Sequence, residues 1–566
     1  MVPKLISVDK NPDKWRRIYH LQLAVRLVFA LVGPGYIHPD EHYQNAEVIA
    51  GRQLGVFTAR TWEWDPAFPC RSIIPAATTI GIPYTMILRW IWWNPENISP
   101  LVMFLTERLT FFFASLILDH TVSQLVLDPA DRSRALALLA SSYVMQTFQV
   151  RPFSNSIEAI LVALSLTTLK SLTETQWNRG LGAFAPDLIS LAIYGVLGVF
   201  TRPTFLAFTL PIAIEALVWT YRRASAATSG QPSRAFWVFW LRLVGLPMLL
   251  VLMYTQCFVF VDTLFFRGNI YDMVLTPLNF LRYNLSSDNL AEHGVHPRWL
   301  HLIVNLPLIV GPGLLYYGIR AARQLWRPTP TPLLSEKGEK PVEGGTVFRA
   351  PLYVIVSAVT ILSAFRHQEP RFLVPLLVPF IALVAQDSQL QRLGRLFWVS
   401  WIISNMALAI VFGFLHQGGV VPSLIDLHDR LHDLNANAPP EFNSTLASVV
   451  YWKTYMPPWH LLAVQAEDVT SGRYVLTDLA GASSETMLKH IVGTPAQETL
   501  VVAPLYAEYG LPQGKRDCFE LVDSEFPHLD LDHLPEAMAQ GWYDGMTLGI
   551  FTVDTTCLGS EDAAVQ

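Results

Sequence analysis

Eleven apolar stretches, separated by short polar or charged segments, follow one another through the first 415 residues. A helix of roughly 20 apolar residues crosses a bilayer, and tight hairpins allow spans down to about 15. The pattern therefore predicts a polytopic α-helical membrane protein with about 11 transmembrane helices. The predicted spans are 18–37, 100–127, 134–150, 156–171, 187–201, 203–220, 236–261, 299–318, 348–365, 372–387 and 396–415.

The composition agrees with a membrane protein. Hydrophobic residues make up 51% of the chain and charged residues only 15%, whereas soluble globular proteins carry about 25% charged residues. The net charge of −6 includes no long basic run, which argues against a nucleic acid partner. The N-terminus lacks the short apolar core and the small-residue cleavage site of a secretory signal. The first apolar stretch is therefore predicted to be a retained span.

The orientation of the spans can be tested in two ways. With a cytoplasmic N-terminus, Lys and Arg cluster in the segments on the cytoplasmic side, as the positive-inside rule requires. The break at 201–203 is short, and a single kinked helix there would invert everything after it. Acceptors for N-glycosylation, which are used only outside the cytosol, fall on the opposite side in the same arrangement. They are Asn97, Asn284 and Asn443, although Pro100 close behind Asn97 disfavours its use.

This arrangement divides the chain into a cytoplasmic N-terminus (1–17), a transmembrane domain (18–415) and a luminal C-terminal domain (416–566). The first luminal loop, 38–99, is rich in tryptophan and is predicted to be helical, with an amphipathic stretch at 76–93 typical of the membrane interface. The C-terminal domain contains short runs of β-branched residues, which predict a small α/β domain. If that domain is extracytoplasmic, Cys518 and Cys557 within it could form a disulfide.

Charged residues at the predicted outer ends of the spans are the main indication of chemistry. Asp40 and Glu41 stand beside each other just past the first span, where unpaired charges are costly. A single Arg or His at a helix end usually extends its charged group to the membrane–water interface. Five charged segments at span ends on the same side of the membrane instead favour a shared site. The chain contains neither dense Cys/His spacing for a metal, nor a phosphate-binding Gly-rich loop, nor a nucleophile elbow. A carboxylate among cations fits general-base transfer from a phosphate-linked donor.

Four motifs carry a family resemblance. The run His38-Pro39-Asp40-Glu41-His42-Tyr43-Gln44 resembles the first-luminal-loop signature of the endoplasmic-reticulum mannosyltransferases of glycosyltransferase family 22, which have the GT-C fold. The segments 151–158, 367–372 and 416–420 are similar to further signatures of that family, in the expected order. Gln368 departs from the pattern, because many members carry Lys there. The form of residues 38–42, together with 452–458, most resembles the members that add the fourth mannose to the GPI-anchor precursor.

The resemblance implies an inverting transfer of mannose from dolichyl-phosphate-mannose to the third mannose of a GPI glycolipid precursor, in the endoplasmic-reticulum membrane with a luminal active site. Asp40 would take the proton from the attacking 2-hydroxyl, supported by Glu41. Arginine suits the departing phosphate because its planar fork matches phosphate oxygens, so that neither a metal nor another cofactor is expected. The substrate-binding candidates are His38, His42, Gln44, Arg151, Arg202, His367, Glu369, Arg371, His416 and Gln417.

Alternative functions stay open at this stage. Transfer of the third GPI mannose, or of a mannose onto the lipid-linked N-glycan precursor, would use the same donor chemistry with another acceptor. A lipid transporter or flippase would also have many spans, but its charges tend to lie near the bilayer midplane and its halves are often repeats. A non-catalytic scaffold subunit would keep the architecture and tolerate loss of Asp40.

Overall fold

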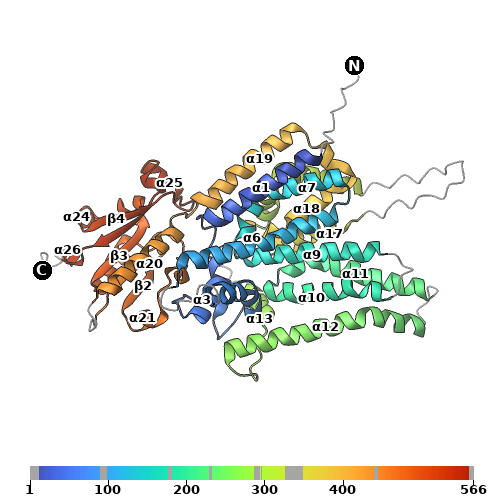
Figure 1. Cartoon of the computed structure of the whole chain (residues 1–566), viewed down its shortest axis with the longest axis horizontal. Coiled ribbons are helices and arrows are strands. Elements are labelled where there is room, and N and C mark those ends of the chain that lie inside the picture. The colour runs from blue at the N-terminus through green and yellow to red at the C-terminus, as the bar shows by residue number, and fades with distance from the viewer. Residues whose placement is uncertain are drawn as a thin grey trace, which may run out of the picture.

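A computed structural model of the protein describes residues 12–89, 98–175, 181–228, 233–285, 294, 296–325, 348–438 and 444–559. Most of the helices run side by side in one bundle, and the strands of the C-terminal segment gather beyond one end of it (Figure 1). Helix α3 (Ala46–Leu54), which follows Asp40 closely in the chain, lies at that same end. We call this the Asp40 end of the bundle.

Within the described ranges, five helices are long and apolar enough to cross a membrane, or six if one bent pair is counted as a span. The chain is thus a helical membrane protein, as the sequence predicts, while the count of eleven spans stays a prediction. The five are α6 (Pro100–Leu125), α9 (Ser154–Glu174), α11 (Phe205–Ala227), α12 (Arg234–Arg267) and Arg395–Leu415, which joins α19 (Arg395–Ile410) to a π-helical turn (Val411–Leu415).

Three more helices coincide with predicted spans. They are α1 (Pro12–Val32), α10 (Ala185–Thr201) and α17 (Ala350–Ala364). Helices α10 and α11 are separate and lie side by side (Figure 1), so the segment 201–203 is a break between two helices and not a kink within one.

Three other predicted spans are not continuous helices. The span 134–150 is divided into α7 (Pro129–Ala140) and α8 (Tyr143–Gln146), because the Ser142 hydroxyl accepts a hydrogen bond from Val144 N at 3.3 Å and starts a new helix. The span 299–318 bends by 108° between its halves, where Gly311 has a φ of 75°. The span 372–387 begins as a 3₁₀ helix, η7 (Pro370–Leu376), and continues as α18 (Leu377–Ala385).

The described part of the first loop holds several short helices joined by non-helical segments such as 55–61 and 65–72. It contains α2 (Asp40–Tyr43), α3, a 3₁₀ turn at Trp62–Trp64 and a run of short helical turns from Ile73 to Arg89. Tyr36 and Tyr43 donate hydrogen bonds to the carbonyls of Met456 at 2.9 Å and Pro457 at 2.5 Å, respectively. The loop is thereby attached to the C-terminal segment.

The C-terminal segment begins with α20 (Val420–Asn437) and folds around a mixed sheet of order β2-β1-β3-β5-β4. Strand β1 runs parallel to β2 and β3, whereas β5 is antiparallel to β3 and β4. Cys518 and Cys557 form a disulfide, with 5.6 Å between their Cα atoms. The strands are β1 (Ala447–Tyr451), β2 (Tyr474–Asp478), β3 (Glu498–Pro504), β4 (Phe519–Glu525) and β5 (Leu548–Val553).

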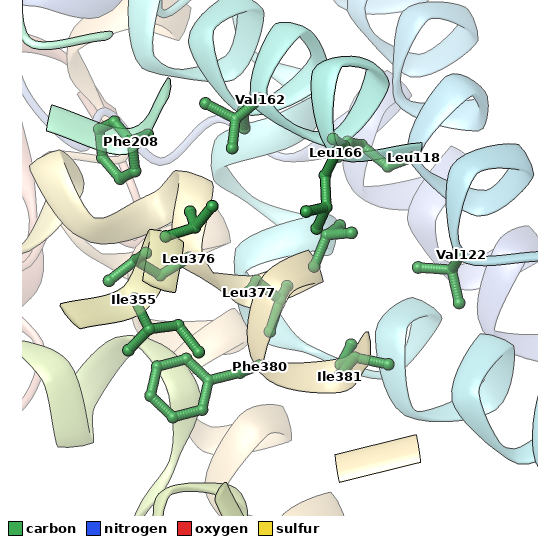
Figure 2. Close-up of a cluster of buried hydrophobic side chains, with 14 of the residues drawn as sticks. Leu118, Val122, Val162, Leu166, Phe208, Ile355, Leu376, Leu377, Phe380 and Ile381 are labelled. Atoms are coloured by element: carbon green, nitrogen blue, oxygen red, sulfur yellow. The ribbon is translucent and has the colours of Figure 1, made fainter. Parts of the chain in front are cut away.

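The main apolar core lies inside the bundle and positions the 367–372 hairpin. Leu376 and Leu377, directly after that hairpin, are buried in one cluster with Val162 and Leu166 of α9 and Phe208 of α11 (Figure 2). Each buried aliphatic side chain contributes about 1.5 to 3 kcal/mol relative to exposure in water. The start of η7 is therefore held against α9, and the charged residues before it are fixed at the Asp40 end.

A buried ion cluster joins the first loop to the bundle. Glu41 Oε1 lies 2.6 Å from Arg108 Nη2 of α6 and 3.3 Å from Arg151 Nε. All three side chains are buried. Because removing water from a charge is costly unless an opposite charge replaces it, this cluster fixes α2 against α6 and the turn before α9.

The cluster extends to the C-terminal segment through His460. Its Nδ1 lies 2.5 Å from Glu47 Oε2, and its Nε2 lies 3.0 Å from Glu107 Oε1. Burial alone would lower the pKa of His460, but Glu107 and Glu47 together raise it to about 9. The imidazole is therefore protonated at neutral pH, and three carboxylates (Glu41, Glu47, Glu107) face three cations (Arg108, Arg151, His460).

We expect His460→Gln to lower the free energy of unfolding by about 3 to 5 kcal/mol, because it leaves two buried carboxylates without their cation. The raised pKa makes this contribution complete below the ordinary value of 6.5 and lost as the pH rises through about 9. Thermal unfolding of the purified protein between pH 6 and 10 should therefore show a wild-type advantage that shrinks with rising pH. The exposed His432→Gln is the matched control, and a constant advantage at all pH values would contradict the assignment.

Candidate active site

Asp40 is the first residue of α2 and stands at the Asp40 end of the bundle with its side chain 24% exposed. Pro39 begins the helical turn, and the imidazole of the neighbouring His38 lies against Asp40, the next residue of that turn. His38 Nδ1 accepts a hydrogen bond from Asp40 N at 3.1 Å and lies 3.3 Å from Asp40 Oδ1. Asp40 is thus the carboxylate of the motif that solvent or a substrate can reach.

The 367–372 hairpin brings a second carboxylate and a cation to Asp40. Arg371 Nη1 donates to Asp40 Oδ2, and its Nε and Nη2 grip Glu369 in a bidentate pair, with Nη2 at 2.9 Å from Oε1. His367 Nε2 lies 2.7 Å from Glu369 Oε1, and His38 Nε2 lies 3.7 Å from Glu369 Oε2. Five predicted site residues therefore meet in one connected set.

Ion pairing outweighs burial in this set. Burial would raise the pKa of Asp40, but Arg371 and His38 hold it well below its usual range. Burial likewise opposes ionisation of Glu369, whose pKa is held low mainly by Arg371 and His38. Burial would lower the pKa of Arg371, whereas Asp40 and Glu369 raise it. Asp40 is consequently ionised at neutral pH and able to accept a proton.

A chain of hydrogen bonds leads from Asp40 back into the first loop. Gln44 Nε2 donates to Asp40 Oδ2 and lies 3.4 Å from Glu63 Oε2, while Gln44 Oε1 accepts from Ser154 Oγ at 2.6 Å. Arg71 donates to Glu63 Oε1 from Nε at 2.9 Å and from Nη2 at 2.6 Å. Sequence reasoning missed Glu63 and Arg71, because each is an isolated polar residue with no periodic or spaced partner, and it included Ser154 in the 151–158 signature without giving it a role.

Arg202 lies at the break between α10 and α11, close to the same set. Its Nε donates to Thr204 Oγ1 at 3.3 Å and lies 3.6 Å from Glu158 Oε2, and its guanidinium sits 5.3 Å from the ring centre of Phe372. Among the residues that the structure describes, its buried Nη1 has no hydrogen-bond partner. Burial, with the nearby Arg71, lowers the pKa of Arg202 to about 10. It remains a cation with an unused donor, as an anionic ligand requires.

Other predicted site residues are placed away from Asp40. Glu41 and Arg151 belong to the buried ion cluster, and Arg151 also donates to the carbonyls of Phe412 at 3.3 Å and Gly413 at 3.4 Å. His42 is buried, with its Nε2 at 3.6 Å from Glu41 Oε1. The adjacent Asp40 and Glu41 thus face different environments, one reachable and one closed.

The 416–417 turn attaches the C-terminal segment to the end of the last long helix. His416 is buried, and Gln417 N donates to the carbonyl of Leu529 at 3.0 Å, while Gln417 Oε1 accepts from Tyr455 N at 3.3 Å. These contacts are within the protein, so the structure gives both residues a linking position. Neither makes a hydrogen bond to Asp40 or Arg371 in the described part of the chain.

Gln368, the departure from the family pattern, is turned away from Asp40. Its Oε1 accepts from His301 N at 2.8 Å, and its Nε2 donates to the carbonyls of Phe365 at 3.0 Å and Ser363 at 3.2 Å. The amide therefore closes the base of the hairpin. A cation is not required at this position to hold the 367–372 segment in place.

Of the three glycosylation candidates, only Asn284 lies among the described residues. It is in α13 (Thr276–Leu285), half-buried, and its Nδ2 donates to the carbonyl of Phe280 at 2.9 Å. Asn97 and Asn443 lie outside the described residues.

One group within the described ranges has donor atoms close enough to hold a metal ion. It consists of His42, Glu107 and His460, whose candidate ligand atoms lie within 4.8 Å of one another. The surrounding ion cluster already balances three carboxylates with three cations, so a divalent ion would have to displace the proton from His460. The group also lies on the side of α2 where the buried Glu41 stands, and not on the side where the partly exposed Asp40 stands.

The arrangement around Asp40 combines an ionised carboxylate with cations in a partly dehydrated setting. Among the described residues, Asp40 Oδ1 is paired with His38 alone, whereas Oδ2 accepts from both Arg371 and Gln44. Oδ1 is therefore the atom able to receive a proton from a hydroxyl. The free donor of Arg202 provides a place for negative charge. Together, the carboxylate of Asp40 and the free donor of Arg202 suit a reaction in which an alcohol receives a group while an anionic leaving group departs.

Residues 17–463 match the Alg9-like mannosyltransferase family. "GPI mannosyltransferase 4" of Emericella nidulans is 34% identical over 92% of this chain and 93% of its own length. The human "GPI alpha-1,2-mannosyltransferase 4" is 33% identical over 95% of each chain, and the Saccharomyces cerevisiae "GPI mannosyltransferase 4" is 30% identical over 91% and 95%.

Among solved structures, ArnT from Cupriavidus metallidurans, bound to undecaprenyl phosphate, aligns with a TM-score of 0.46 and 12% identity over 95% of this chain and 98% of that chain. The family match covers most of the chain, and relatives above 30% identity extend over nearly all of it. The chain belongs to the Alg9-like mannosyltransferase family.

Proposed function

We propose that this mannosyltransferase adds the fourth mannose of the GPI anchor, transferring it from dolichyl-phosphate-mannose to the 2-hydroxyl of the third mannose of the glycolipid precursor. Relatives that carry the name GPI mannosyltransferase 4 cover more than nine tenths of the chain in both a filamentous fungus and human, which supports this acceptor. The single structural observation that supports the chemistry is Asp40, a reachable ionised carboxylate among arginines.

In the proposed reaction, Asp40 Oδ1 takes the proton of the acceptor hydroxyl while its oxygen attacks the anomeric carbon of the donor. The bond between that carbon and the phosphate oxygen breaks in the same displacement, which inverts the anomeric centre without a covalent enzyme intermediate. The phosphate leaves with one more negative charge than it had in the donor. Arg202 is the proposed partner for that charge, because the planar donor fork of arginine matches phosphate oxygens. We expect these residues to suffice without a metal or another cofactor.

The setting proposed for this reaction is a GT-C arrangement of eleven spans in the endoplasmic-reticulum membrane, with the Asp40 end in the lumen. The bias of Lys and Arg toward the opposite side supports this orientation. The disulfide between Cys518 and Cys557, at the Asp40 end, also fits an oxidising compartment.

Replacing Asp40 by Asn should reduce mannose transfer by about a hundredfold or more, because the general base is lost while the size of the side chain is kept. Transfer of labelled mannose by microsomes containing the full-length variant measures this effect. Asp65→Asn, in the same loop but exposed, is the matched control and should retain activity. Unchanged transfer by a folded Asp40→Asn enzyme would contradict the role of Asp40 as base.

Replacing Arg202 by Gln should lower kcat/KM for the lipid-linked donor roughly 10- to 100-fold, since a charge-assisted hydrogen bond contributes about 1.5 to 3 kcal/mol. Arg202→Lys should fall between the wild type and Arg202→Gln, because it keeps the charge but not the fork. Arg222→Gln, exposed and near the other end of α11, is the control. Equal kinetics for Arg202→Gln and the control would remove Arg202 from the donor site.

Depletion of the protein should cause a GPI precursor with three mannoses to accumulate, because its product carries the fourth. Lipid extracts labelled with mannose and analysed by mass spectrometry identify the accumulated species. A precursor with two mannoses would instead place the enzyme at the preceding step. Accumulation of a truncated lipid-linked N-glycan precursor would assign it to the other glycolipid pathway.

A further inference from the structure

Helix α13 has an apolar face that the described part of the protein leaves partly open. Leu278 is 38% exposed, Leu281 36% and Leu285 74%. The spacing of three and four residues places these side chains on one face of the helix. Two apolar residues of the segment just before α13 are more exposed still, with Tyr271 at 87% and Met273 at 77%.

The opposite face of α13 is bound to the first loop. Asn279 Nδ2 donates to the carbonyl of Pro69 at 3.0 Å, and the ring of Tyr283 stacks on Trp62 with 3.8 Å between ring centres. Phe280 lies under the guanidinium of Arg71, with 5.6 Å to the ring centre. Arg71 in turn holds Glu63, which is the second member of the hydrogen-bond chain from Asp40. The helix therefore has one face on the site and one face free.

The start of α13 is fixed as well. Asp262, near the end of α12, accepts a hydrogen bond from Thr276 Oγ1 of α13 at 3.0 Å. The same carboxylate accepts from Ser72 Oγ at 2.9 Å and from Ile73 N at 3.0 Å in the first loop. Because these groups are buried, α12, α13 and the loop form one rigid junction.

The free face continues the lipid-facing surface of α12. Only 11% of the most apolar window of α12 is buried inside the protein, and its apolar side chains stay exposed up to Leu264, one turn before the helix ends. Ile270, Tyr271 and Met273 carry this exposed apolar surface from the end of α12 toward α13. Water contact with this much exposed apolar surface is unfavourable.

We propose that α13 lies in the membrane interface at the Asp40 end, with its leucine face in the lipid and its other face holding Arg71. An amphipathic helix that follows a span and carries one exposed cation, Arg282, beside its leucines suits the boundary between headgroups and acyl chains. The occupant of this face is therefore the bilayer surface, and not a protein partner.

This position has a consequence for catalysis that rests on the proposed function. The phosphate of a lipid-linked donor lies at the bilayer surface, at the depth of the headgroups. A helix fixed at that depth would hold Arg71, and through Glu63 and Gln44 the Asp40 carboxylate, at the level of the phosphate. The membrane contact itself does not depend on which glycolipid is the substrate.

Spin labels on the full-length protein in lipid nanodiscs test the proposal. A label at Leu281→Cys, in a Cys257→Ser background that removes the exposed free thiol, is compared with one at Val492→Cys. Val492 is also exposed and apolar, but it shares a face of α22 (Ser484–Gly493) with the exposed pair Glu485 and Lys489. We expect collision with dissolved oxygen, relative to a water-soluble nickel complex, to be several-fold higher at 281 than at 492.

Equal accessibility to the nickel complex at 281 and 492 would overturn the proposal by placing α13 in water. Shielding of 281 from both reagents would also overturn it, because it would indicate a protein cover. A label at Leu278→Cys repeats the measurement in case the first variant folds poorly.

The wild-type chain provides a further test, since a bulky glycan on Asn284 is incompatible with an embedded helix. Endoglycosidase treatment should therefore leave Asn284 unchanged, contrary to what its acceptor motif alone predicts, and a released glycan there would contradict the proposal.

Discussion

Charges buried at one end of an apolar helix bundle must be paired within the protein, because lipid cannot solvate them and water reaches them poorly. This constraint organises the Asp40 end. The pair formed by Asp40 and Arg371 joins residues 331 positions apart in the chain. Glu41, the next residue, is paired instead with Arg108 and Arg151 in a closed cluster. One dipeptide thus links a reachable ion pair to a buried one.

The division between Asp40 and Glu41 has a local cause. Both residues start the single turn of α2, and side chains one position apart on a helix point about 100° away from each other. Asp40 consequently faces the 367–372 hairpin, whereas Glu41 faces α6. The sequence alone shows two equivalent carboxylates side by side, and it cannot predict which face of a four-residue helix will be covered.

Sequence patterns predicted the features that depend on composition and missed those that depend on packing. Apolar length identified the long helices α6, α9 and α12, and the brief break around Arg202 proved to separate two helices. The 108° bend at Gly311 was not predictable, because a glycine and a proline in an apolar run are also compatible with a straight span. Short runs of β-branched residues likewise marked β3 and β5, but not their antiparallel pairing.

The sequence also fails to distinguish the roles of the arginines at the Asp40 end. Arg151, Arg202 and Arg371 look alike in the sequence, each at a predicted helix end. Their partners in the structure distinguish them. Arg151 is paired with Glu41 and backbone carbonyls, and Arg371 is paired with two carboxylates. Arg202 has a buried N–H donor without a described partner. Gln368 shows the converse, since a position that the family pattern marks as cationic serves here to close a hairpin.

In the proposed reaction, the pairing of Asp40 would also ease the binding of an anionic donor beside a general base. Two free carboxylates, Asp40 and Glu369, would repel a phosphate monoanion at this site. Arg371 contacts both of them at once, so that its single positive charge offsets one of their two negative charges before any ligand arrives. The cancellation makes Asp40 a weaker base, as its low pKa shows. In the proposed reaction the ion pair would therefore lower the basicity of Asp40 and, in return, reduce the negative charge that an anionic donor meets.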